Sequence, residues 1–148
     1  MTQNPTTFVS LELTRAALLA HGIEVFRVDE QSIQLAVRVR HHLMDAGVSV
    51  HFEPDTNVLL TVRVQGSDHP GLAATQLFGK IRDAIADTAA ARSFHEHASH
   101  CREIRDPGDD SRILDLWYEL TFAKPARDTS GLLDDVSWAL GVPKCIDY

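Results

Sequence analysis

Apolar and polar residues alternate over two stretches near the middle of the chain, at 48–52 and 58–64. Alternation with a period of two places every second side chain on the same face of a β-strand. The residues between the stretches, Pro54-Asp55-Thr56-Asn57, are typical of a turn. The pattern therefore predicts a hairpin whose apolar face is formed by Val48, Val50, Phe52, Val58, Leu60, Val62 and Val64.

A second hairpin is predicted over 94–122. Its first strand, 94–104, contains few apolar residues, which is typical of an edge strand or of a strand that faces solvent. A turn follows at Pro107-Gly108-Asp109-Asp110. In the second strand, one face carries Leu114, Leu116, Tyr118, Leu120 and Phe122, and the other face carries Asp115, Trp117, Glu119 and Thr121.

Two helices are predicted from apolar residues that recur at intervals of three and four. The longer helix spans 71–91, directly after Pro70, and its buried face is formed by Leu77, Phe78, Ile81 and Ile85. The shorter helix lies within DTSGLLDDVSWALG, and its inward residues are Leu132, Leu133, Val136 and Leu140.

The first 56 residues are more ambiguous. Gly22 and Gly47 are each predicted to end a helix that is followed by an extended run. Residues 30–40 fit a strand or a helix equally, and Gly47 favours a helix for the residues directly before it. Together the elements predict an α+β fold, with helices packed on one face of a mostly antiparallel sheet. We expect a single domain over 1–148, with a helix-rich part at 1–56 and a strand-helix-strand-strand-helix core at 57–148.

The composition restricts the classes of partner. The formal net charge of -7 argues against a nucleic-acid-binding surface, because such a surface needs clustered lysine and arginine. No apolar run is long enough to cross a bilayer, and the first residues lack the features of a signal peptide. We therefore expect a soluble, cytoplasmic protein that binds neither nucleic acid nor membrane. Cys101 and Cys145 are predicted to be free thiols.

The densest polar cluster lies at 95–101 and reads HEHASHC. It resembles the HxHxDH run of metallo-β-lactamase-like hydrolases, with Ser99 in place of the aspartate. His95 and His97 share a face of a strand and are the candidate metal ligands. The alternative is an exposed, histidine-rich edge strand, which we favour because a metal-binding carboxylate is missing. The chain contains no other catalytic motif, so we expect no enzymatic activity and no cofactor.

The stretch VLLTVRVQGSDHPGLAATQLF resembles the first strand, turn and helix of an ACT-type ligand-binding domain. In that family a D-x-P-G-L turn exposes backbone N–H groups to the carboxylate of a small molecule. Asp68, Pro70, Gly71 and Leu72 match this turn. The predicted elements over 58–148, with a possible last strand at 144–148, fit the βαββαβ plan of the family. The resemblance implies a cytoplasmic, amino-acid-binding regulatory module.

A second resemblance covers more of the chain. Tail terminator and tail-completion proteins of tailed bacteriophages have an opening helix, a VRVQ-like strand, a long alanine-rich helix and a closing hairpin similar to RDPGDDSRILDLWYELTF. The segments 11–21, 58–65, 71–91 and 102–122 match this order. The resemblance implies a non-enzymatic subunit that forms a homo-oligomeric ring in a phage tail or head–tail connector. Its partners would be further copies and other virion proteins, first in the host cytoplasm and then in the virion.

Trp117 is the candidate interface residue of such a ring. It lies beside Asp115 and Glu119 on the polar face of its predicted strand. A large aromatic side chain on a polar face is common at protein interfaces, although a helix that covers the face is the alternative. We favour the ring subunit as the function, with the ACT-like module as the alternative.

Overall fold

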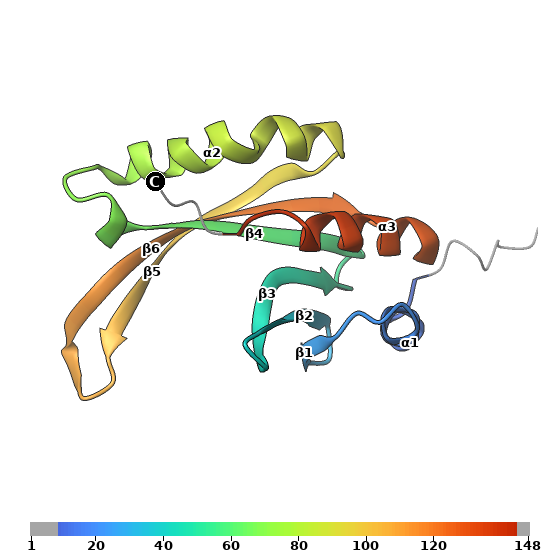
Figure 1. Cartoon of the computed structure of the whole chain (residues 1–148). Coiled ribbons are helices and arrows are strands. Elements are labelled where there is room, and N and C mark those ends of the chain that lie inside the picture. The colour runs from blue at the N-terminus through green and yellow to red at the C-terminus, as the bar shows by residue number, and fades with distance from the viewer. Residues whose placement is uncertain (1–8, 145–148) are drawn as a thin grey trace, which may run out of the picture. The chain divides into compact units, whose positions relative to one another are not determined.

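The computed structural model describes residues 9–144 and contains three helices and six strands over that range (Figure 1). The strands form one antiparallel sheet in the order β1-β2-β3-β4-β6-β5. The predicted α+β fold class is therefore confirmed. The helices are α1 (Leu11–Ala20), α2 (Ala74–Ala91) and α3 (Thr129–Leu140). The strands are β1 (Val25–Val28), β2 (Ser32–Val39), β3 (His42–His51), β4 (Asn57–Gln65), β5 (His95–Asp106) and β6 (Asp109–Pro125).

Contacts divide the chain into two compact units, each made of two segments. Unit 1 contains residues 9–60 and 123–142, and unit 2 contains residues 61–122 and 143–144. The boundaries fall inside β4 and β6, so each of these strands contributes residues to both units. The prediction of a single domain over 1–148 stays a prediction.

The core of unit 1 is built around the predicted β3–β4 hairpin, which is confirmed. Val48 lies opposite Leu60 and Val50 opposite Val58, and none of these four side chains is more than 1% exposed. Helix α1 begins after Ser10, whose hydroxyl accepts a hydrogen bond from the N–H of Leu13. Helices α1 and α3 pack on each other. They add the fully buried side chains of Leu18, Leu132 and Val136 to this core, together with those of Thr14 and Ala139.

The segment before residue 57 is not rich in helix, which corrects the prediction. Residues 9–56 contain one helix and three strands, and residues 42–46 belong to β3 and not to a helix. Gly47 does adopt the predicted positive φ, at 73°, but it lies within β3. The register with β2 shifts there: Gln34 pairs with Ser49, whereas Ala36 pairs with Asp45. Gly47 therefore forms a β-bulge instead of a helix end, and β3 is visibly bent (Figure 1).

Unit 2 consists of one long helix packed on strands. Four residues along α2 are buried: Leu77, Ile81, Ile85 and Ala89. The helix begins at Ala74 and not at residue 71, because the chain after β4 first forms a short 3₁₀ turn at Gly66–Asp68. Strand β5 lies at the end of the strand order, as predicted, and its first nine residues are exposed. The tip of the β5–β6 hairpin extends well beyond α2 (Figure 1).

A partly buried ion pair in unit 1 joins β6 to α3. Lys124 Nζ lies 2.8 Å from Asp135 Oδ1, and the Asp135 side chain is only 7% exposed. A carboxylate in such a place is poorly solvated, so the loss of its cation is costly. In unit 2, Arg82 and Glu96 form a comparable pair at 2.7 Å, but both side chains are at least 40% exposed.

We expect Lys124→Met to lower the free energy of unfolding by about 3 kcal/mol, because the nearly buried carboxylate of Asp135 loses its ion-pair partner. The matched change at the exposed pair, Arg82→Met, should cost less than about 1 kcal/mol. Urea unfolding at pH 7 measures both values. Equal losses in the two variants would contradict this interpretation of the Lys124–Asp135 pair.

Candidate interaction surface

The β2–β3 hairpin of unit 1 carries an apolar face that extends beyond the core. Ile33 and Leu35 are fully buried, but Val37 and Val39, on the same face of β2, are 45% and 51% exposed. Met44 of β3 lies directly opposite Val37 and is 50% exposed. Three large apolar side chains therefore meet solvent together at the end of this hairpin.

The turn that joins β2 to β3 adds positive charge to this apolar face. Arg40 and His41 form a two-residue turn with φ angles of 51° and 72°, and Arg38 and His42 flank it. Both turn positions lie in the left-handed region, where asparagine and glycine are the usual residues. Arg38 pairs with Glu24 at 2.8 Å, whereas Arg40 forms no ion pair with any residue between 9 and 144. We call residues 37–44 the hairpin end.

An acidic groove lies elsewhere in unit 1. It has a volume of about 790 Å³, and its apolar lining comes from both segments of unit 1: Val9, Leu11, Phe52, Pro54, Pro125 and Ala126. Four carboxylates also line it: Glu12, Glu30, Glu53 and Asp55. None of the four forms an ion pair with a described residue, and no lysine or arginine of the described chain lines the groove. We call this site the acidic groove.

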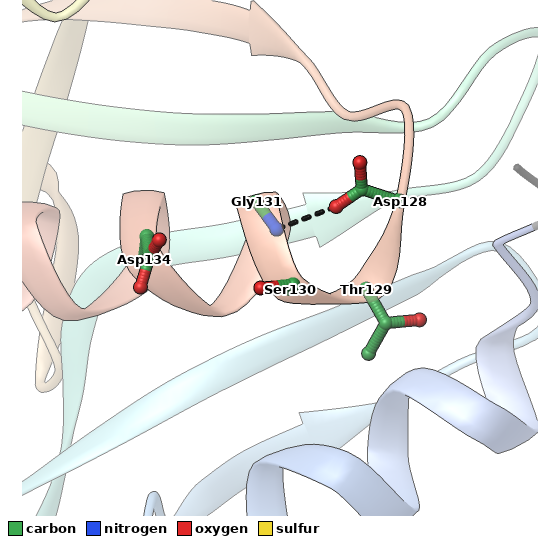
Figure 2. A pocket seen from close by; sticks show the side chains of 5 residues that line it. All are labelled: Asp128, Thr129, Ser130, Gly131 and Asp134. Atoms are coloured by element: carbon green, nitrogen blue, oxygen red, sulfur yellow. Dashed lines mark hydrogen bonds between the residues drawn. The ribbon is translucent and has the colours of Figure 1, made fainter. Parts of the chain in front are cut away.

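A second pocket of unit 1, of about 600 Å³, lies at the N-terminus of α3 (Figure 2). A helix N-terminus attracts anions because its first N–H groups lack partners within the helix. Here the carboxylate of Asp128 already accepts a hydrogen bond from the N–H of Gly131 at 2.6 Å. Asp134 adds a second carboxylate to the lining. The chain thus supplies its own anion, and this pocket is poorly suited to an anionic ligand.

In unit 2, the polar face of the strands holds Trp117 between two arginines. The guanidinium carbon of Arg63 lies 4.0 Å from the centre of the Trp117 ring, and that of Arg102 lies 5.7 Å from it. Both contacts are cation–π interactions. Trp117 is half-buried as a result. Its predicted role as an interface anchor stays a prediction.

Asp115 lies next to Trp117 and accepts four hydrogen bonds. Its carboxylate accepts hydrogen bonds from Ser67 N–H at 3.0 Å, Ser67 Oγ at 2.8 Å, Leu116 N–H at 2.8 Å and Trp117 Nε1 at 3.3 Å. Partial burial of Asp115 raises its pKa, but the hydrogen bonds from Ser67, Leu116 and Trp117 outweigh it, so the pKa lies below its ordinary value.

The ACT-like turn is exposed in the structure. Asp68 ends the 3₁₀ turn, and Pro70, Gly71 and Leu72 connect it to α2. Two of the backbone N–H groups nearby are already engaged: Leu72 N–H donates to His69 O, and Ala73 N–H donates to Gln76 Oε1 at 2.8 Å. These two groups are not free to bind a carboxylate.

The candidate metal ligands His95 and His97 lie at the start of β5, and both are exposed. Within residues 9–144, no three histidine, cysteine, aspartate or glutamate side chains lie close enough together to hold a metal ion. Cys101 is a free thiol, as predicted, whereas Cys145 lies outside the described residues. No helix in the same range is long and apolar enough to cross a membrane.

Sequence reasoning missed the hairpin end and the acidic groove. The run VRVRHHLM alternates apolar and basic residues, and this local pattern could have identified the hairpin end. The acidic groove has no such local pattern, because its residues are distant in the sequence. Comparison with protein-family models, with curated proteins and with solved structures found no match.

We expect Ser67→Ala to raise the pKa of Asp115, because the variant loses the hydrogen bond from Ser67 Oγ. The folded-state pKa is lowered, so the stabilisation is present above the unfolded pKa of about 3.9 and is lost as the pH falls through the folded value. The stability difference between wild type and variant should thus be present at pH 7 and vanish in strong acid. NMR titration of the Asp115 carboxyl carbon measures the pKa. Unfolding at pH 7 and in strong acid measures the stability difference.

The control for that experiment is Ser111→Ala. Ser111 lowers the pKa of Asp109 in the same way, through its hydroxyl and its N–H. This variant should move the titration of Asp109 and leave that of Asp115 unchanged. An unchanged Asp115 titration in Ser67→Ala would show that Ser67 does not determine its pKa.

Two Gly→Ala substitutions in unit 2 should have effects of opposite sign. A Cβ at Gly71 or at Gly79 would meet no atom within 4 Å, but Gly71 has a φ of 86° whereas Gly79 lies inside α2. We expect Gly71→Ala to lower the free energy of unfolding by about 1 kcal/mol. Gly79→Ala should raise it by about 0.5–1 kcal/mol. Thermal unfolding measures both changes. A stabilising effect of Gly71→Ala would contradict the positive φ of Gly71.

Proposed function

We propose that this protein is a non-enzymatic structural subunit that assembles with copies of itself. The observation that carries the proposal is the hairpin end, where Val37, Val39 and Met44 share one exposed face. Exposed apolar side chains that lie together mark surfaces that bind other proteins. The basic residues of the turn give the same surface a charge opposite to the net charge of -7 of the whole chain, which favours binding to a further copy.

The specific assembly that we propose is a ring in the tail or head–tail connector of a bacteriophage. Its support is the order of elements shared with tail terminator and tail-completion proteins: α1, β4, α2 and the β5–β6 hairpin. The other partners would be neighbouring virion proteins, and the protein would pass from the host cytoplasm into the virion. No catalytic step and no cofactor are needed for this role.

An ACT-like amino-acid-binding module is the second candidate. The observation that favours it is the strand order β4-β6-β5 with α2 after β4, which matches the order that the βαββαβ plan requires. Arg63 N–H also donates to Lys144 O at 2.8 Å, where a last strand would begin. The rest of that strand, at 145–148, lies outside the described residues. A rise in melting temperature with one of the common amino acids would support this candidate.

We expect sedimentation velocity to show an association that increases with protein concentration. A dilution series at constant pH and salt measures this. A monomer at every concentration would exclude the structural subunit and leave the ligand-binding module.

A further inference from the structure

We infer that the hairpin end of one copy binds in the acidic groove of a second copy. The inference rests on the proposed function and names the surfaces through which the subunits would associate. Both surfaces belong to unit 1, so each is defined by contacts within one compact part of the chain.

The two surfaces are complementary in charge. The hairpin end carries the guanidinium of Arg40 beyond the Arg38–Glu24 pair, and no acidic residue lies between 37 and 44. The groove carries four carboxylates that have no ion pair with a described residue. Opposite charges without internal partners attract across an interface and fix its orientation.

The two surfaces also match in apolar character. Val37, Val39 and Met44 are each about half exposed at the hairpin end. The groove offers Phe52, Pro54 and Pro125 among its lining residues. Its volume of about 790 Å³ exceeds what three such side chains occupy. Burial of both apolar surfaces supplies the free energy of association, and the charges define the register.

The positions of the surfaces exclude binding within one copy. The pair Val39–His42 closes the β2–β3 hairpin at the turn, and the pair Ser32–His51 closes it at the opposite end. Glu30 and Phe52 of the groove flank that opposite end. Ser32 and Val39 are seven residues apart along β2, which corresponds to about 23 Å of strand. A hairpin end therefore reaches only the groove of another copy.

This arrangement is head-to-tail. Each copy offers one hairpin end and one groove, and the two surfaces differ. Such heterologous contacts do not stop at a dimer: they close into a ring when the rotation between copies permits, and otherwise continue as a filament. The inferred contact thus yields the type of assembly that the proposed function requires.

Variants of each surface test the inference. Val39→Ser/Met44→Ser removes the apolar side chains of the hairpin end, and Glu30→Lys/Glu53→Lys reverses charges in the groove. Each double variant should weaken association at least about 30-fold in Kd, the loss expected for residues at the centre of an interface. Sedimentation velocity measures Kd, and circular dichroism verifies the fold.

A third variant separates binding from stability. Arg40→Asn/His41→Gly places the usual residues of the turn at the two positions with positive φ. It should raise the melting temperature of the protein and still weaken association, because the guanidinium of Arg40 is lost. Unchanged association in this variant would contradict the role of the charge.

Mixing the first two variants distinguishes a head-to-tail contact from a symmetric one. The groove variant retains its hairpin end, and the hairpin variant retains its groove, so an equal mixture has one intact contact per pair. We expect each variant alone to be monomeric and the mixture to form dimers. A groove variant that still assembles by itself would overturn the inference, because the hairpin ends would then bind each other or another surface.

Two controls carry matched changes outside these surfaces. Ile113→Ser removes an apolar side chain of β6 that is 46% exposed, and Asp83→Lys/Asp87→Lys reverses two exposed charges on α2. Both should leave Kd within about twofold of wild type. This change is small, because a tenfold change in Kd corresponds to about 1.4 kcal/mol.

Wild-type association that the hairpin and groove variants do not weaken would overturn the inference and leave the proposed function standing. A monomeric wild type would instead overturn the proposed function.

Discussion

The burial of alternate residues along β4 is the constraint on which both compact units depend. Val58 and Leu60 are fully buried in unit 1, and Val62 and Val64 are fully buried in unit 2. Each such side chain contributes about 1.5–3 kcal/mol when it leaves water. A shift of one residue in the pairing of β4 would turn all four toward the polar face. The register of β3 against β4, and with it the position of the β2–β3 hairpin, follows from this strand.

Much of the fold is predictable from local patterns. The two hairpins, α2 and α3 are recognisable because their apolar residues follow one period without ambiguity. Residues 42–46 are wrongly predicted as helix because Gly47 resembles a helix end. The expected positive φ of Gly47 is correct, but it forms a β-bulge and does not end a helix. The bulge arises from the pairing with β2, whose register shifts between Gln34 and Ala36. Such a shift depends on the partner strand and leaves no pattern in β3 itself.

The candidate interaction surfaces are less predictable, for a physical reason. Val37 and Val39 continue the alternation that starts with Ile33 and Leu35. The sequence does not show that the first pair is exposed and the second pair is buried. The groove is lined by segments that only folding brings together. Trp117 is recognisable as an unusual residue on a polar face, but its contacts with Arg63 and Arg102 come from two other strands. Exposure and contacts between distant segments are tertiary properties.

The division of unit 1 into two segments has a consequence for its biosynthesis. Helix α3 is synthesised only after the whole of 61–122, and until then α1 lacks the helix against which it packs. The long segment of unit 2 is complete at that stage, and domains generally fold as their residues leave the ribosome. Unit 1 therefore keeps part of its apolar core open while unit 2 can already form. Nascent chains that pause before residue 129 would expose this core to chaperones, and premature contact between such chains is a route to misassembly.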